Sequence, residues 1–93
     1  MKITGAQITA ARNLLRITQA ELAAAAGVGE QTVKRFEADR TLPHRGSLTK
    51  LLNELERRGI EFTNGTGIGV RLNFEKAAEF ARAAAQARND SDR

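Results

Sequence analysis

Two short helical segments separated by a glycine constrain the fold of this chain more than any other feature. The residues Thr18-Gln19-Ala20-Glu21 form a capping box, in which Thr18 accepts a hydrogen bond from a free backbone N–H and Glu21 returns one. The helix that starts here is expected to end at about Ala26, because Gly27 adopts the left-handed conformation without steric strain. A second helix is expected over residues 30–38. Two short helices joined by a glycine turn form a helix–turn–helix unit.

Small and apolar residues stand where these two helices must meet. Ala23 occupies the position where the helices would cross, and a small side chain is needed there. The packing between the helices is then supplied by Leu22, Val28, Val33 and Phe36. The alternative is an ordinary helical hairpin inside a helical core. The capping box, the turn glycine and the fixed apolar spacing together favour the helix–turn–helix unit.

The rest of the chain predicts further helices and a hairpin. Apolar periodicity predicts a first helix over residues 5–16 and a fourth helix that begins with Ser47 as its N-cap and stops at Gly59. Apolar and polar residues then alternate on both sides of Asn64-Gly65, which predicts a two-stranded β-hairpin. Asn73 can cap a last helix that runs to about Arg88, and residues 89–93 are expected to fray.

Composition narrows the class of function. The 93 residues include no cysteine and one histidine, His44, so a structural or catalytic metal site is not expected. Nothing in the sequence suggests a nucleophile with its base or a pair of catalytic carboxylates, so we expect neither an enzyme nor a cofactor. The net charge of +4 favours polyanionic partners. No apolar run approaches the ~20 residues of a membrane span, so we expect a cytoplasmic protein that does not bind membranes.

The stretch ITAARNLLRITQAELAAAAGVGEQTVKRFEADRTLP resembles the Cro/C1-type (xenobiotic-response-element-type) helix-turn-helix repressors, and the resemblance covers roughly Ile3 to Leu55. It implies a mainly α, lambda-repressor-like domain of four to five helices, here with a C-terminal hairpin and a final helix. It also implies a sequence-specific regulator of transcription whose partner is double-stranded DNA. A small-molecule ligand is not expected, because the chain carries no added ligand-binding domain.

The resemblance implies a role for individual residues. In this family the second helix of the unit enters the major groove and the N-terminus of the first contacts phosphate, which makes Gln19 the phosphate anchor. The exposed face of the recognition helix consists of Glu30, Gln31, Thr32, Lys34 and Arg35. Arg35 is a candidate reader of guanine. The basic residues Arg40, Arg45 and Lys50 flank this helix and are expected to contact phosphate.

The family pattern also bears on five individual positions. Arg12 and Glu37 correspond to an arginine and a glutamate that often pair in this family, and such a pair would be structural. Gly29 stands where the family usually has Ser or Thr, so the recognition helix lacks a side-chain cap at its start. Asp39 stands where the family often has glycine, and Asp tolerates the left-handed conformation. Glu30 either accepts a hydrogen bond from cytosine or only places a favourable charge at a helix N-terminus.

Residues 1–59 are therefore predicted to be the DNA-binding domain and residues 60–93 a dimerisation extension. One helix–turn–helix unit reads few base pairs, so a homodimer on a palindromic operator is expected, acting as a repressor. Either the hairpin or the last helix can carry the dimer interface, and the competing interpretation is that this tail covers its own core. The alternative function is a protein-interaction module of the antitoxin or antiactivator kind. The basic recognition helix favours DNA.

Overall fold

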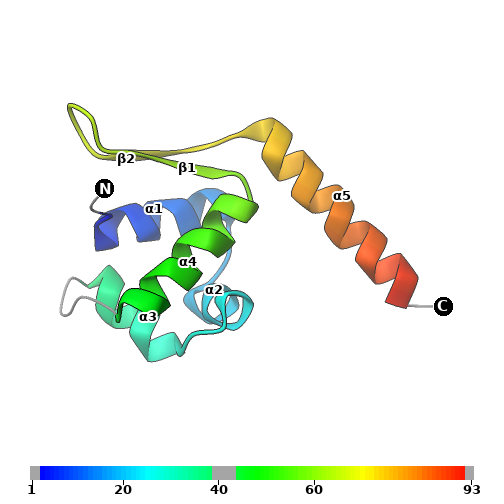
Figure 1. Ribbon diagram of the computed structural model, residues 1–93, viewed down its shortest axis with the longest axis horizontal. Coiled ribbons are helices and arrows are strands. Elements are labelled where there is room, and N and C mark those ends of the chain that lie inside the picture. The colour runs from blue at the N-terminus through cyan, green and yellow to red at the C-terminus, as the bar shows by residue number, and fades with distance from the viewer. Residues whose placement is uncertain (1–2, 39–43, 92–93) are drawn as a thin grey trace.

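The computed structural model describes residues 3–38 and 44–91. Along these residues the elements are α1 (Gly5–Leu15), α2 (Gln19–Ala26), α3 (Glu30–Glu37), α4 (Arg45–Arg57), β1 (Ile60–Thr63), β2 (Gly69–Leu72) and α5 (Phe74–Ser91). Helices α1–α4 form one body, the hairpin lies over this body, and α5 extends away from it (Figure 1). The predicted mainly α fold with a hairpin and a final helix is confirmed.

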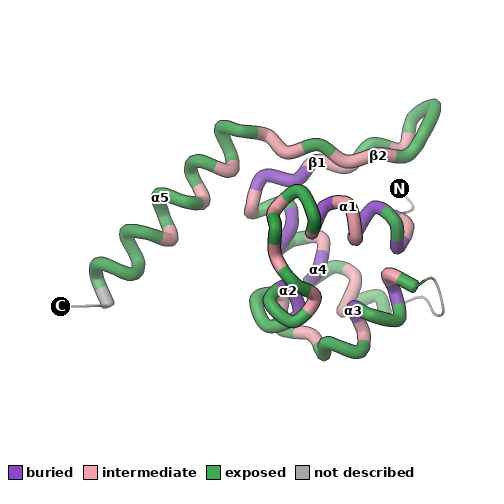
Figure 2. Tube along the Cα trace, turned by 180° about the vertical axis from the view of Figure 1, so that it is seen from behind, coloured by how far each residue is buried: buried purple, intermediate pink, exposed green. Residues whose placement is uncertain are grey.

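The core lies where α1–α4 meet beneath the hairpin. Each of α1–α4 and strand β1 contributes at least one fully buried apolar side chain, and the largest are Ile8, Leu22, Val33, Leu51, Leu55 and Ile60. Burying a side chain of this size stabilises the fold by about 1.5–3 kcal/mol. In contrast, α5 is exposed along most of its length (Figure 2).

The start of α4 differs from the sequence prediction. The helix begins at Arg45, because His44 is its N-cap and the Nδ1 atom of His44 accepts a hydrogen bond from the N–H of Gly46 at 3.3 Å. Ser47 lies inside the first turn, so the assignment of Ser47 as the N-cap is wrong. An imidazole nitrogen is a weaker sequence signal for a cap than a hydroxyl, because caps are dominated by Ser, Thr, Asp and Asn.

The hairpin forms as predicted, but its turn does not use the Asn64-Gly65 pair in the expected way. Antiparallel pairing runs from Ile60 opposite Leu72 to Thr63 opposite Gly69, which leaves a five-residue connection over residues 64–68. A two-residue turn with Asn-Gly requires positive φ at both residues. Among the described residues, positive φ occurs at Arg16, Gly27 and Gly59 and not in this connection.

The end of the hairpin is held by hydrogen bonds from Gln7, a buried residue of α1. The amide nitrogen of Gln7 donates to the carbonyl oxygens of Thr63 at 3.2 Å and Gly69 at 3.1 Å. Gln7 is only 2% exposed, so these hydrogen bonds satisfy a polar group that would otherwise be costly to bury. Gln7 therefore fixes the position of the two strands over α1.

The beginning of α5 is fixed by Asn73 and by the turn at Gly59. Asn73 Oδ1 accepts from the N–H of Lys76 at 3.0 Å, which confirms Asn73 as the cap. The N–H of Asn73 donates to the carbonyl of Gly59 at 2.8 Å. At its other end α5 continues to Ser91, so the expectation that residues 89–93 fray is wrong for 89–91. A hydrogen bond from Gln86 to Asp90, one turn apart, supports this last part of the helix.

Candidate nucleic-acid interface

The connection between α2 and α3 is built from the local signals that the sequence contains. Thr18 Oγ1 accepts from the N–H of Glu21 at 3.0 Å, and Glu21 Oε1 accepts from the N–H of Thr18 at 3.0 Å. These hydrogen bonds lower the pKa of Glu21, whose negative charge suits the N-terminal end of α2. Gly27 ends α2 with φ of +74°, as predicted, and its N–H bonds to the carbonyl of Ala23 at 3.0 Å. The direction of α3 is therefore set by a very short connection.

The packing of α3 leaves one of its faces open. Val33 and Phe36 are buried against α2, where Leu22 and the small Ala23 are buried as well. Because these residues point inward, the polar residues on the opposite face of α3 point outward. Gln31, Lys34 and Arg35 are exposed, and Thr32 is half-buried.

Charges on this open face are partly paired with one another. Glu30 Oε2 lies 2.8 Å from Lys34 Nζ, one turn further along α3. This ion pair is a further role of Glu30 that the sequence did not indicate, and it reduces the charge that Lys34 can offer to a phosphate. Within the described residues, Gln31 and Arg35 make no side-chain hydrogen bond or ion pair, so their donors are free to bind a ligand.

A buried ion pair joins α1 to the end of α3. Arg12 Nε lies 2.9 Å from Glu37 Oε2, and Arg12 Nη2 lies 3.0 Å from Glu37 Oε1. The hydroxyl of Thr9 also donates to Glu37 Oε1, at 2.9 Å, a contact that the sequence did not indicate. Burial alone would raise the pKa of Glu37, but the hydrogen bonds outweigh it and the pKa is lowered. The predicted pairing of Arg12 with Glu37 is thus present and is extended by Thr9.

Gln19, the expected phosphate anchor, is held by the same carboxylate. Its amide nitrogen donates to Glu37 Oε1 at 3.2 Å, and the side chain is half-buried. Gln19 is the first residue of α2, where backbone N–H groups have no partner within the helix. Glu37 therefore fixes the Gln19 side chain at a helix end that suits an anion.

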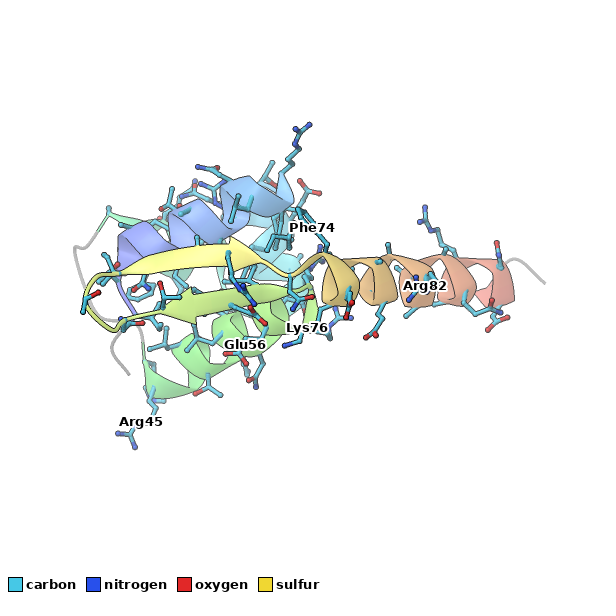
Figure 3. The ribbon with its side chains drawn as sticks, turned by 90° about the horizontal axis from the view of Figure 1, so that it is seen from above. Arg45, Glu56, Phe74, Lys76 and Arg82 are labelled. Atoms are coloured by element: carbon cyan, nitrogen blue, oxygen red, sulfur yellow. The ribbon has the colours of Figure 1, made fainter. Side chains whose placement is uncertain are left out.

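Of the basic residues expected to flank α3, Arg45 and Lys50 lie within the described residues and Arg40 does not. Arg40 and Asp39 lie outside the described residues, so the predictions for these two positions concern a segment without a structural description. Arg45 extends into solvent from the first turn of α4 (Figure 3). Lys50 is also exposed on α4. Gly29 has no side-chain hydrogen bond as N-cap of α3, as the sequence predicts.

Other kinds of site are poorly represented in the described parts of the chain. A groove of about 180 Å³ lies between α1 and β2, lined mostly by small and apolar residues such as Ala6, Ala10, Ile68 and Val70. The described side chains include no cluster of three or more His, Asp or Glu that could hold a metal ion. None of the described helices is both long and apolar enough to cross a bilayer.

The geometry of α2, the Gly27 turn and α3 defines a helix-turn-helix DNA-binding domain. The family model described as helix-turn-helix matches residues 8–62, more than half of the chain. This protein therefore belongs to the Cro/C1-type helix-turn-helix family of DNA-binding transcription regulators. The match reaches from α1 into β1. A search of curated protein sequences finds no match.

Proposed function

We propose that this chain is a homodimeric repressor that binds a palindromic operator and reads it with α3 in the major groove. The observation that carries the proposal is the open face of α3. One side of α3 packs into the core through Val33 and Phe36. On the opposite side, Gln31 and Arg35 are exposed and present hydrogen-bond donors to a ligand. An Arg side chain can bind guanine bidentately and a Gln side chain can bind adenine in the same way.

The surroundings of α3 support binding to the DNA backbone. The N-terminus of α2 carries N–H groups without a partner within the helix beside Gln19, and Arg45 and Lys50 add exposed positive charge on α4. We assign these groups to phosphate contacts, which position a protein on DNA without reading its sequence. Glu30 is assigned a modulating role, because its carboxylate is held by Lys34.

We infer a dimer from the small size of α3, the helix that is proposed to contact the bases. α3 has eight residues, and one such helix contacts only a few base pairs. Two copies related by a two-fold axis double the contacted sequence and require half-sites about 34–36 Å apart. The residues beyond the body, from the hairpin onward, are assigned to dimerisation.

Footprinting on the DNA upstream of the protein's own gene tests this proposal. The expected result is protection of two half-sites of inverted sequence, about one helical turn apart. A duplex with that sequence should bind about 10³-fold or more tightly than a scrambled duplex of the same length. Equal binding to both duplexes would contradict sequence-specific regulation and favour the protein-interaction alternative.

A further inference from the structure

α5 carries an apolar face that the rest of the chain leaves uncovered. Phe74 is 82% exposed, the most exposed large apolar side chain described. Ala78, Ala81 and Ala85 follow it at helical spacing and are exposed too. These four residues lie on one side of α5 and are called the Phe74 face. An exposed aromatic residue at one end of an apolar helix face is typical of an interaction surface.

Contacts on a different side of α5 fix its direction. The guanidinium carbons of Arg57 and Arg58 lie 4.8 and 4.7 Å from the centre of the Phe80 ring. Both arginines are ion-paired with Glu54 in α4, at 2.8 and 2.6 Å. Ala77 and Phe80 are half-buried, whereas the Phe74 face is not. α5 is therefore attached to α4 through its Ala77–Phe80 side, with the Phe74 face directed to solvent.

Figure 3 shows the same division around the first turn of α5. Phe74 and Lys76 extend from opposite sides of the helix. Lys76 Nζ lies 3.3 Å from Glu61 Oε2 on β1, which gives α5 a second attachment to the body. Asn73 also donates to Glu61 Oε2, at 3.2 Å. The Phe74 side takes part in none of these attachments.

The charges beside the Phe74 face complement a second copy of the same helix running in the opposite direction. Glu75 and Arg82 are seven residues apart, so they lie two turns from each other on the same flank of this face. When a two-fold axis perpendicular to both helices relates them, the helices run antiparallel. The same flank of each helix then lies beside that flank of the other. A crossing near Ala78 places Glu75 of each copy beside Arg82 of the other. In a parallel pair this flank would instead face the opposite flank of the partner helix, which carries Ala77 and Ala84, so Glu75 and Arg82 would not meet.

We propose that α5 pairs with α5 of a second copy, antiparallel and about a two-fold axis near Ala78. Phe74 of each copy then lies between Ala81 and Ala85 of the other, so a large side chain packs against two small ones. This inference rests on the proposed homodimer and assigns its interface to α5 rather than to the hairpin. The two Glu75–Arg82 pairs fix the direction and register of the helices.

Charge reversal in the full-length protein tests the pairing. Glu75→Arg and Arg82→Glu each create two like-charge pairs, so each variant should raise the dissociation constant of the dimer about tenfold. A mixture of the two variants restores both attractive pairs, and the heterodimer should form in preference to either homodimer. Glu79→Arg makes the same change in charge on a side away from the Phe74 face, so it should leave the dissociation constant unchanged. Sedimentation equilibrium measures all four samples.

Phe74→Ala provides a second measurement that does not depend on charge. Phe74 contributes little to the monomer core because it is exposed, so the variant should keep the wild-type helical content and lose dimer affinity. A wild-type dimer that none of these variants weakens would overturn the pairing through α5 and leave the operator-binding dimer standing. A wild-type chain that stays monomeric at high concentration would overturn both.

Discussion

Arg12 and Glu37 form a two-point ion pair between α1 and α3, with nitrogen–oxygen distances of 2.9 and 3.0 Å. The Glu37 side chain is 6% exposed and that of Arg12 is 17% exposed. The same carboxylate receives hydrogen bonds from Thr9 and Gln19. One residue at the end of α3 thus holds α1, α3 and the first residue of α2 in fixed positions.

Removing one partner of this pair is expected to be strongly destabilising. Arg12→Ala leaves a buried carboxylate without its cation, and Glu37→Ala leaves the guanidinium without its acceptor, at a cost of about 3–5 kcal/mol. Urea unfolding of both single variants and the double variant measures the coupling. The double variant should cost clearly less than the sum of the singles. Additive losses would contradict a direct interaction.

The pair also predicts how stability depends on pH. The pKa of Glu37 is lower in the folded chain than in the unfolded chain, where it is about 4.3. Its stabilising effect is therefore complete above that unfolded value and is lost as the pH falls through the folded value. The difference in unfolding free energy between wild type and Glu37→Gln should be largest near neutral pH and shrink below about pH 4. A difference that stays constant over this range would contradict the assignment.

Replacing Gly27 or Gly59, which both have positive φ, by alanine is expected to lower the free energy of unfolding by different amounts. At Gly27 a Cβ atom would meet nothing within 4 Å, so Gly27→Ala should lose only about 1–2 kcal/mol, for the left-handed backbone. At Gly59, with φ of +108°, a Cβ atom would lie 2.9 Å from the backbone nitrogen of Ala77. Gly59→Ala should therefore cost about 2–5 kcal/mol, because steric overlap adds to the strain. Denaturant unfolding compares the two variants, and equal losses would contradict the close approach of α5.

Glu30 is expected to moderate binding rather than to read a base. Glu30→Gln removes a negative charge near DNA and frees Lys34 from its ion pair. Affinity for operator and scrambled duplexes should rise together, by about two- to fivefold. The dependence on salt should also become steeper. A loss of affinity confined to the operator would instead show that Glu30 contacts a base.

Local signals made most of the body predictable. The capping box at Thr18, the turn at Gly27 and the apolar spacing that ends at Phe36 each depend on neighbours within a few residues, so sequence alone indicates them. The hairpin was also predictable, because apolar and polar residues alternate along both of its strands. The pairing of Arg12 with Glu37 came from family resemblance and not from local pattern.

The contacts that sequence did not indicate join distant segments. Gln7 is hydrogen-bonded to Gly69, 62 residues further along the chain, and its own neighbours give no sign of that partner. The cap at His44 displaced the more typical Ser47, because an imidazole nitrogen lay within reach of Gly46. The direction of α5 depends on its close approach to Gly59, which is a tertiary contact.

The central claim, that α3 reads DNA sequence, is tested most directly by measuring how Arg35→Ala and Gln31→Ala bind operator and scrambled duplexes. Both variants should lose about 1–3 kcal/mol on the operator and much less on the scrambled duplex. Lys34→Ala serves as the comparison and should weaken binding to both duplexes alike, as a phosphate contact does. Equal losses on both duplexes for Arg35 and Gln31, or no loss at all, would contradict the assignment of α3 as the reading helix.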